Sequence, residues 1–460
     1  MLAVTAISLT LRGAIYCPSH FGINRIENPL ILMANLDPGT PFPLRVLGAP
    51  RQVLILILYD SKTAIAIRYK RDYAEDDNTM RGKLVYPYSD ALLQYEFKKD
   101  HPLKPDRLKL TYELSKQLGL LDKVKQIEPK VATRQDLELF HTPEFIDAVI
   151  SCGKQACASL RYGLGTPDNP IFPRIYDAAA RYVGATLEGM KEIMAGASNA
   201  FCISGGLHHA QRSRASGFCI FNDIAIAIMQ LLNKKKCKVL YLDIDAHHGD
   251  GVQNAFYRSK DVMTISVHQS GKTLFPGTGN VYEAGGAEGV GYSVNVPVIP
   301  GAGTIELVRI LNEVIVPLFE SFRPNLLVTQ LGVDGHFMDP LAHLAYTSHA
   351  YETVINKMKD LTGEYCDIGW LAVGGGGYHP VNVARLWTLF LALMLDEEVP
   401  QKFSDDFILA CNNMGYDRCP EGMRDNNDVE QMYYSREDVT LDLDRQIRKI
   451  EEIIFPYHGL

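Results

Sequence analysis

The sequence lacks long apolar runs, and it has no surplus of basic residues. Apolar runs such as Val53 to Tyr59 are far shorter than the roughly 18 to 20 residues that cross a bilayer, so no transmembrane helix is expected. The formal net charge of -8 leaves no basic surplus to displace counterions from nucleic acid or to bind an anionic membrane. Neither nucleic acid nor a membrane is therefore expected as a direct partner, although an acidic rim could attract a cationic substrate.

The sequence also lacks paired cysteine motifs and a convincing targeting segment. Its nine cysteines are odd in number and contain no CxxC pair, which argues against both a disulfide framework and a thiolate zinc site. The N-terminal segment is apolar but has no basic start, contains Arg12 and offers no clear cleavage site, so a signal peptide is not expected. We therefore expect a globular protein of the reducing cytoplasm.

The first eighty residues differ in character from the rest of the chain. Proline and glycine turns interrupt short apolar runs there, without a helical period that could build a core. We expect residues 1–83 to be an N-terminal extension and residues 84–460 to be the main domain. Met80 directly precedes the first segment of α/β character, which makes it an alternative translation start. Mass spectrometry of the natively expressed protein would test that alternative.

From residue 84 onward, short β-rich runs alternate with amphipathic stretches of helical period. This alternation predicts an α/β fold with a central parallel sheet and helices on both of its faces. Strands are expected at 84–87, 200–204, 238–244, 262–268, 325–331 and 368–373. Helices are expected at 105–118, 174–196, 222–233, 303–322, 347–361 and 381–396. Pro324 should end the helix at 303–322, and the last fifty residues should be helical or irregular, with the charges of DLDRQIRKIEEII on a solvated face.

Polar clusters follow directly after predicted strands, at the edge of a parallel sheet where ligand sites form. In YLDIDAHHGDGV, Asp243, Asp245 and His247 stand at alternate positions, so that Asp245 and His247 project to one side. An isolated DxH could merely cap the next helix, but so many acidic and imidazole groups exceed what capping explains, and burying them without a cation would be costly. Asp334, after another strand, is the candidate third metal ligand. This donor set suits Zn²⁺ or Fe²⁺, and we prefer zinc.

Further residues supply the other groups that a metal-dependent hydrolase needs. His208 and His209 follow a predicted strand and provide a candidate base, although they could also be a plain polar pair. Asp243 and Asp250 remain to orient the two imidazoles. Tyr378 ends the glycine run of LAVGGGGYHP and could donate a hydrogen bond to a developing oxyanion. The glycine run could instead be a tight turn or a phosphate cradle, although no Lys-Ser/Thr follows it. Together the residues point to hydrolysis of an amide.

Six collinear motifs over roughly residues 84–396 resemble those of class I-type histone deacetylases, most closely the prokaryotic acetoin utilization deacetylases. They are HPLKPDRLKLTYEL, GGLHHAQRSRASGFCIFNDIAIAI, VLYLDIDAHHGDGVQNAFY, FPGTG, YSVNVPV and GGGGYHPVNVARLWT. The resemblance implies the arginase/deacetylase α/β fold and makes residues 84–460 the catalytic domain. It implies a zinc-dependent deacetylase of acetyl-lysine in proteins, such as an acetyl-CoA synthetase. Residues 1–80 have no counterpart in it.

The resemblance also implies roles for single residues. Zinc would be held by the three ligands named above, His209 paired with Asp250 would be the general base and acid, and Tyr378 would polarise the acetyl carbonyl. The acyl-lysine tunnel is implied at Gly217, Phe218, Phe275, Leu341 and Gly376, with Asp168 on the rim after a one-residue shift of the alignment. Arg107 is implied to line an internal channel for acetate. Structural potassium is implied at two sites, an inner one of Asp243, Asp245, His247, Ser266 and Val267 and an outer one of Phe256, Ser259, Val262 and Tyr292.

Three other functions remain open at this point. An acetylpolyamine deacetylase would apply the same chemistry to a narrower cationic substrate. A ureohydrolase of the same fold would hold two manganese ions, and the spacing of Asp334, His336 and Asp339 is similar to its second metal cluster, although His336 stands where a bridging aspartate is required. An inactive acyl-lysine-binding protein is the third. The loop DGHFMDPLAHL departs from that of eukaryotic class I enzymes, so recognition of eukaryotic corepressors is not expected.

Overall fold

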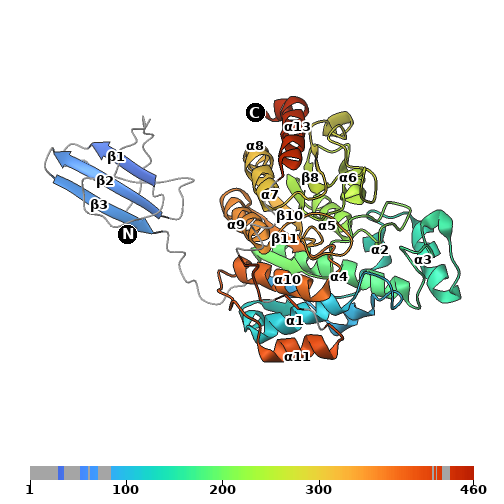
Figure 1. Cartoon of the computed structure of the whole chain (residues 1–460). Helices are drawn as coiled ribbons and strands as arrows, with labels where there is room; N and C mark the ends of the chain where they lie inside the picture. The colour runs from blue at the N-terminus through green and yellow to red at the C-terminus, as the bar shows by residue number, and fades with distance from the viewer. Residues whose placement is uncertain are drawn as a thin grey trace. The chain divides into compact units, whose positions relative to one another are not determined.

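The computed structural model describes residues 84–416, 419–420, 422–426 and 436–460, together with the backbone of three strands at 30–35, 52–60 and 63–70. The chain divides into two compact units, residues 1–79 and residues 80–460. In the first unit the three strands form one sheet (Figure 1), made of β1 (Leu30–Asn35), β2 (Gln52–Asp60) and β3 (Thr63–Lys70). Strand β1 pairs in parallel with β2, and β2 pairs antiparallel with β3.

A parallel sheet runs through the second unit. Among its described residues, eight strands lie in the order β5-β4-β6-β11-β10-β7-β8-β9, and their pairings are all parallel. The strands are β4 (Val85–Pro87), β5 (Lys125–Ile127), β6 (Asn199–Cys202), β7 (Val239–Asp243), β8 (Val262–Gln269), β9 (Ser293–Val298), β10 (Leu326–Gln330) and β11 (Gly369–Val373). Strands β7, β8, β10 and β11 are buried along their whole length, as is typical of strands covered on both faces. The parallel α/β fold expected from the sequence is confirmed.

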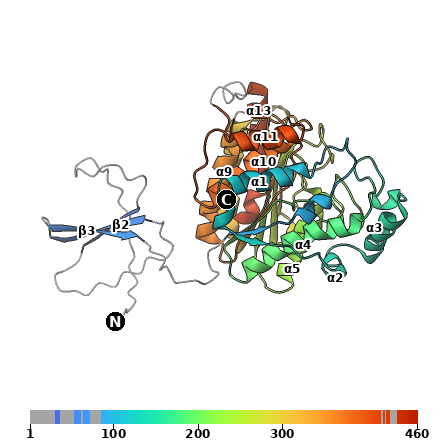
Figure 2. The same ribbon diagram turned by 90° about the horizontal axis from the view of Figure 1, so that it is seen from below.

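Helices cover both faces of this sheet (Figure 2). One layer contains α4 (Ile175–Met194), α5 (Asp223–Leu232) and α6 (Asp250–Phe256), which contact one another in this order. The other layer contains α1 (Asp106–Gln117), α10 (Pro380–Met394) and α9 (Ser348–Tyr365), again in contact in this order. The remaining α-helices are α2 (Arg134–Leu137), α3 (Pro143–Gln155), α7 (Thr304–Ile310), α8 (Val316–Phe322), α11 (Asp405–Asn413) and α13 (Glu437–Ile453). Among the described residues, every helix is too short or too polar to span a bilayer.

Local chemistry explains where two helices that position the site begin. Asn222 caps α5, because its side chain accepts a hydrogen bond from the N–H of Ala225 at 2.9 Å. Helix α10 begins with Pro380, whose fixed φ suits the first turn of a helix. The same helix is anchored beneath the sheet edge, since the buried indole of Trp387 donates to the carbonyl of Leu331 at 2.8 Å, just after β10.

Several elements differ from the sequence-based expectation, and helices α2, α3 and α6 lie where no helix was predicted. Strands β5 and β9 were not predicted: β5 has only three residues, and β9 contains Pro297, which weakens a strand pattern. Strand β9 lies at the edge of the sheet, where a missing N–H is tolerated. The predicted helix at 303–322 consists of α7, a π-helical segment at Leu311–Ile315 and α8. Pro317 has no N–H for the regular helical ladder, and the wider π turn before it accommodates that gap.

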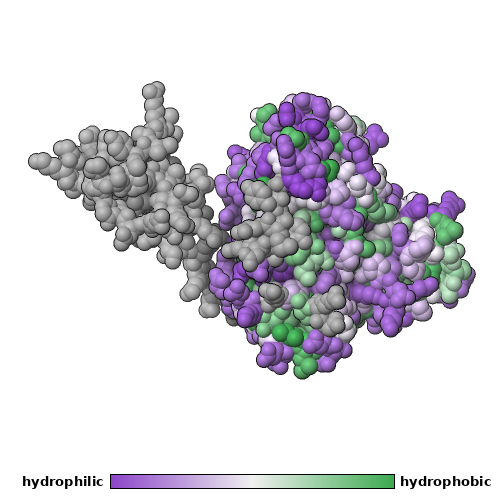
Figure 3. Space-filling model, in the orientation of Figure 1, coloured by the Kyte–Doolittle hydropathy of each residue, from purple (hydrophilic) through white to green (hydrophobic). Residues whose placement is uncertain are grey.

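The charged C-terminal run forms an amphipathic helix. In α13 the apolar side chains of Val439, Leu443, Ile447 and Ile450 are buried, while the charged side chains between them lie on the outer side. On the face of the molecule in Figure 3, hydrophilic residues cover much of the second unit and apolar residues gather in small groups. One such group lies over α11, where Ile408 and Leu409 are exposed.

Candidate active site

Five neighbouring strands deliver the predicted site residues to one edge of the sheet. In spatial order these strands are β6, β11, β10, β7 and β8. The residues that follow or end the first four are, in the same order, the pair His208 and His209, then Tyr378, Asp334 and the segment 243–247, whereas Ser266 lies within β8. Because all five strands are parallel, their carboxyl ends open at one edge, and residues distant in the chain meet there.

Asp245, His247 and Asp334 converge at this edge. Their candidate ligand atoms all lie within 4.8 Å of one another, and all three residues are buried. Nδ1 of His247 lies 2.8 Å from Oδ2 of Asp334 and 3.1 Å from Oδ1 of Asp245. The structure thus brings together the three residues that the sequence singled out as metal ligands.

The electrostatics of these three residues fit a bound cation. Burial and the neighbouring Asp245 carboxylate raise the pKa of Asp334 to about 6. Burial disfavours a charged imidazole, yet Asp245 and Asp334 together raise the pKa of His247 to about 10. The cluster therefore stabilises positive charge at its centre, which a divalent metal ion supplies without any protonation of the ligands.

Two glycines make room for the carboxylates. A Cβ atom on Gly376 would lie 2.1 Å from Oδ2 of Asp334, and one on Gly332 would lie 2.2 Å from Oδ2 of Asp245. The N–H of Gly376 donates to Oδ2 of Asp245 at 2.7 Å. Gly376, expected in the substrate tunnel, thus also forms the wall behind the metal ligands.

Gln330 is a site residue that sequence reasoning missed. Its side-chain amide donates to Oδ2 of Asp245 at 2.6 Å, and its carbonyl oxygen accepts from the N–H of Gly332 at 2.7 Å. The N–H of Ala246 donates to Oδ1 of Asp334 at 2.7 Å. These bonds fix both carboxylates. The only sequence signal was the position of Gln330 at the end of an apolar strand.

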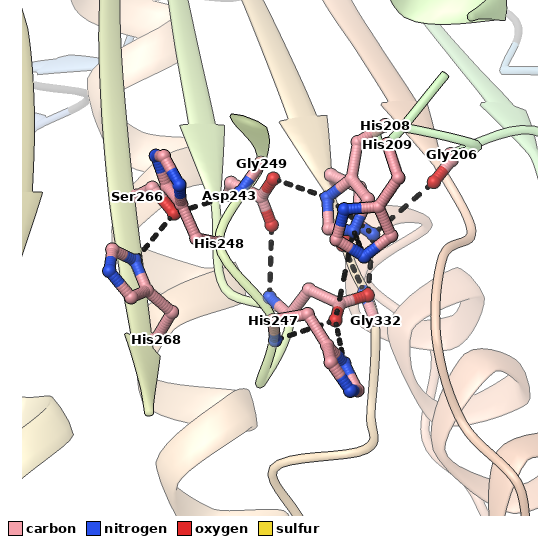
Figure 4. A network of polar contacts seen from close by, with 12 residues as sticks. Gly206, His208, His209, Asp243, His247, His248, Gly249, Ser266, His268 and Gly332 are labelled. Atoms are coloured by element: carbon pink, nitrogen blue, oxygen red, sulfur yellow. Dashed lines mark hydrogen bonds and ion pairs between the residues drawn. The ribbon is translucent and has the colours of Figure 1, made fainter. Parts of the chain in front are cut away.

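Each histidine of the tandem pair has its own carboxylate partner, and Figure 4 shows that of His208, Asp243. Nδ1 of His208 lies 2.7 Å from Oδ2 of Asp243, and Nδ1 of His209 lies 2.7 Å from Oδ1 of Asp250. The two Nε2 atoms are 3.1 Å apart. Both pairings agree with the assignment made from the sequence. Tyr241 adds a bond that was not expected, since its hydroxyl donates to Oδ2 of Asp243 at 2.5 Å.

The two imidazoles differ in their affinity for a proton. Burial and the neighbouring His208 hold the pKa of His209 well below its usual range, so His209 is neutral. Burial opposes charge on His208 as well, but Asp243 and Asp245 outweigh it and raise the pKa of His208 to about 9. Because the carboxylate of Asp250 can only accept at Nδ1 of His209, the Nε2 atom of His209 carries the free lone pair of a base.

Tyr378 lies beside the metal ligands, at the end of the glycine run. Its ring centroid is 6.2 Å from that of His247 and 5.7 Å from that of Phe218. Burial, followed by the charges of Asp334 and Asp245, raises the pKa of Tyr378 well above its usual value. The phenol therefore keeps its proton and can donate a hydrogen bond.

Two aromatic rings flank these groups. The ring of Phe275, which is 41% exposed, packs with its centroid 5.0 Å from that of His209, whereas the ring of Phe218 packs against Tyr378. Phe218 adopts a left-handed φ of 67° and its carbonyl accepts from the hydroxyl of Tyr95 at 2.7 Å. A Cβ on Gly217 would lie 2.4 Å from Cδ2 of His209. Tyr95 was not predicted, and no pattern around it pointed to this contact.

Arg107 lies behind the glycine run. Its buried guanidinium donates to the carbonyl of Gly375 at 2.5 Å and to that of Gly377 at 3.3 Å. It lines a cavity together with Ser204 and Leu207, which stand just before the histidine pair. The hydroxyl of Ser204 is buried there and has no hydrogen-bond partner. Arg107 thus lies at a buried cavity close to the site, and its role at a channel for acetate stays a prediction.

Two predicted rim residues lie at the outer side of the site. Asp168 is exposed, and its backbone carbonyl lies 3.2 Å from Nε2 of His101, whose ring packs 4.5 Å from that of Phe218. Leu341 is partly buried, and its N–H donates to Oδ1 of Asp339 at 2.9 Å. Asp168 therefore approaches Phe218 through its backbone and His101, and its role on the rim stays a prediction.

The residues expected to hold potassium form two groups, and each group includes residues of β8. Ser266 stands opposite Asp243 in the sheet register, and its hydroxyl lies 2.8 Å from Nδ1 of His268 (Figure 4). Val267 follows in the same strand. In the outer group, Val262 begins β8. The backbone carbonyl of Phe256 accepts from the N–H of Ser259 at 2.8 Å, and the backbone carbonyl of Tyr292 accepts from the N–H of Thr264 at 2.9 Å.

His336, which stands where a binuclear centre would require a bridging aspartate, contacts a different group of side chains. Its Nε2 atom lies 2.9 Å from Oδ2 of Asp425 and 3.0 Å from the guanidinium of Arg385. Among the described residues, Asp245, His247 and Asp334 are the one group with the geometry to hold a metal ion. The fold and this site are those of a metal-dependent hydrolase, with one candidate metal centre in the described part of the chain.

Comparison with known proteins defines the family. A model of the histone deacetylase domain matches residues 101–394. Acetoin utilization protein AcuC of Bacillus subtilis is 39% identical over 69% of this chain and 85% of that protein. AcuC of Staphylococcus xylosus is 37% identical over 70% of this chain and 85% of that protein. The crystal structure of an HDAC homolog complexed with SAHA has a TM-score of 0.72 at 29% identity, covering 81% of this chain and 100% of that chain. An HDAC homolog from Aquifex aeolicus has a TM-score of 0.71 at 30% identity, covering 80% and 100%.

The chain therefore belongs to the histone deacetylase family. Its fold is the arginase/deacetylase fold, and the chain is an amide hydrolase of a metal-dependent family. The resemblance seen in the six sequence motifs is confirmed.

Proposed function

We propose that this chain is a zinc-dependent lysine deacetylase of proteins, with its catalytic domain in residues 84–460. The observation that carries the proposal is one arrangement: a three-residue metal cluster lies beside a carboxylate-bound neutral His209 and the protonated phenol of Tyr378. By the resemblance to acetoin utilization deacetylases, the partner is an acetylated protein, and an acetyl-CoA synthetase is the candidate that we prefer. Structural potassium at the inner and outer positions belongs to the same proposal.

Zinc held by Asp245, His247 and Asp334 would polarise the acetyl carbonyl and make a water molecule more acidic. His209 takes the proton of the attacking water on Nε2, because Asp250 occupies its Nδ1–H. Asp250 stabilises the imidazolium that forms. Tyr378 donates its hydroxyl to the oxygen on which negative charge develops.

The same residues complete the reaction. His209 returns its proton to the lysine nitrogen as the amide bond breaks, which makes the amine a good leaving group. The rings of Phe218 and Phe275 enclose an apolar slot that suits the four-carbon stem of lysine. The buried guanidinium of Arg107 attracts the acetate product into the cavity behind the glycine run.

The test is hydrolysis by the purified chain after its metal has been removed and replaced by Zn²⁺ or Fe²⁺. We expect turnover of an acetyl-lysine peptide with zinc, no turnover of the metal-free protein, and none by an Asp334→Ala variant. Acetylspermidine, assayed beside the peptide, separates the two substrate classes, because a higher kcat/KM for the polyamine would contradict the proposal. Comparison of acetylated proteins in a deletion strain and the parent would then identify the physiological substrate.

A further inference from the structure

A buried carboxyl group joins the loop that contains Leu341 to the loop that ends at Tyr378. Asp339 belongs to the loop after the metal ligand Asp334 and is 8% exposed. Its Oδ2 atom accepts the N–H of Tyr378 at 2.8 Å, and its Oδ1 atom accepts the N–H of Leu341 at 2.9 Å. Its own N–H donates to the carbonyl of His336 at 2.8 Å. One side chain thus holds the backbone of the tyrosine loop (residues 374–378) and the backbone at Leu341, the predicted mouth of the tunnel.

The tyrosine loop needs such a partner because its sequence does little to fix its shape. Four glycines precede Tyr378, and two of them have φ values of 140° and 136°, at Gly375 and Gly377. Glycine restricts the backbone less than any other residue, so this segment can adopt many conformations unless other groups hold it. Arg107 holds the carbonyls of the two left-handed glycines. The N–H of Tyr378 itself is held by Asp339 alone among the described partners of that atom.

We propose that Asp339 is a positioning residue, which fixes the backbone of Tyr378 so that the phenol hydroxyl reaches the acyl oxygen of the substrate. The inference rests on the proposed function, because the position of the hydroxyl matters only if an acyl oxygen is bound there. Asp339 does not touch the substrate. It acts through the N–H of Tyr378 and, by its second oxygen, sets the distance between the tyrosine loop and Leu341.

The geometry favours this role over simple stabilisation of the fold. One carboxylate oxygen accepts from Leu341 in the loop of Asp339 itself and the other from Tyr378, so the group links two segments that both carry predicted site residues. A hydrogen-bond donor at an oxyanion acts only when it stands within about 3 Å of the charged oxygen. Displacement of such a group by about 1 Å can lower the rate about 100-fold. Loss of the Asp339 carboxylate should therefore change kcat more than it changes KM.

The first experiment replaces Asp339 by alanine and by asparagine in the full zinc-loaded chain. For Asp339→Ala we expect kcat to fall by about 10- to 100-fold while KM changes by less than about threefold. Asp339→Asn keeps the size of the side chain and one acceptor oxygen, so it should retain an intermediate rate. Zinc content should stay at one ion per chain in both variants. Amide hydrogen exchange in peptides that contain Tyr378 should be faster in the alanine variant, as a readout that does not depend on activity.

The second experiment places Asp339→Ala in a Tyr378→Phe background. If Asp339 acts through the phenol hydroxyl, the alanine substitution should lower kcat by less than about threefold there, because the group that it positions is already absent. Glu306→Ala is a matched control. Glu306 is a buried carboxyl that accepts the N–H of Gly303 at 2.8 Å at the start of α7, away from the metal ligands. Its removal should lower the melting temperature and leave kcat unchanged.

Several outcomes would overturn the proposal: an unchanged kcat in Asp339→Ala, an equal fall of kcat with and without the Tyr378 hydroxyl, or loss of zinc. Unchanged exchange at the Tyr378 amide would overturn it as well. If the wild-type chain itself does not hydrolyse the acetyl-lysine peptide, the proposed function fails. Amide exchange at Tyr378 then decides by itself whether Asp339 holds that loop.

Discussion

Gly376 offers a direct test of how tightly the backbone packs against the metal ligands. Its φ does not require glycine, but the carboxylates beside it leave no room for a Cβ atom. A Cβ atom at this position would lie 2.1 Å from Oδ2 of Asp334 and 2.7 Å from Oδ2 of Asp245. An ordinary contact begins at 3.4 Å, so Gly376→Ala requires a displacement of 3.4 − 2.1 = 1.3 Å between the methyl group and Asp334. Both ligands are buried, so neither can move into solvent.

A displacement of this size is large compared with the tolerance of a metal site. Zinc–oxygen bonds have lengths of about 2.0 to 2.2 Å, and altered groups around the ligands alone reduce metal affinity about 10- to 100-fold. Gly376→Ala moves a ligand itself, so we expect zinc affinity to fall by at least about 100-fold, or about 2.7 kcal/mol. Turnover at limiting zinc should fall in parallel.

The assay is competition for zinc between the metal-free protein and a chelating dye, with kcat measured at saturating zinc. Gly363→Ala is the matched control, since a Cβ there meets nothing within 4 Å in the exposed part of α9. That control should bind zinc like the wild type and gain about 0.5 to 1 kcal/mol in free energy of unfolding. Wild-type zinc affinity in Gly376→Ala, with the fold intact by circular dichroism, would refute the idea that Gly376 leaves the space that Asp334 and Asp245 need to bind the metal.

Three further predictions concern single residues. His209→Ala should lower kcat by about 10²- to 10⁴-fold while zinc remains bound, and a near-wild-type rate would remove His209 from the role of base. Tyr378→Phe should lower kcat by about 10²- to 10³-fold with little change in KM, as measured on the acetyl-lysine peptide; unchanged kinetics would exclude the oxyanion role. Burial lowers the pKa of His141 to about 3, so this side chain is neutral in the folded protein but titrates near 6.5 in the unfolded chain. Its contribution to stability is present above about pH 6.5 and is lost by up to about 1.4 kcal/mol for each pH unit as the pH falls towards 3. Urea unfolding of the wild type and His141→Gln at pH 7 and pH 5 should show a smaller loss in the variant, and equal losses would contradict the assignment.

The part of the site that sequence reasoning found consists of residues whose position follows from strand ends. Asp245 and His247 alternate after β7, and Asp334 follows β10, so the period of an extended chain and the shared edge of a parallel sheet were enough to group them. The partners of the two histidines followed from matching carboxylates to imidazoles. Such arguments use residue types that carry recognisable chemistry at predicted strand ends, which a sequence displays.

The residues that were missed act across long distances in the chain. Tyr95 reaches Phe218 and Asp339 reaches Tyr378 through single hydrogen bonds that no local pattern encodes. The edge strand β9 was missed for another reason, because Pro297 contradicts the usual strand pattern and only its place at the sheet edge makes it acceptable. Sequence periodicity reports local geometry, whereas these contacts depend on which strands become neighbours.

The last strand of the sheet to be synthesised has a consequence for how the enzyme matures. Strand β11 inserts between β6 and β10, so until it is made the sheet consists of two separate halves. One half carries the histidine pair after β6, and the other carries the three metal ligands after β7 and β10. A nascent chain on the ribosome that ends before residue 369 can therefore expose either half but cannot assemble a working centre.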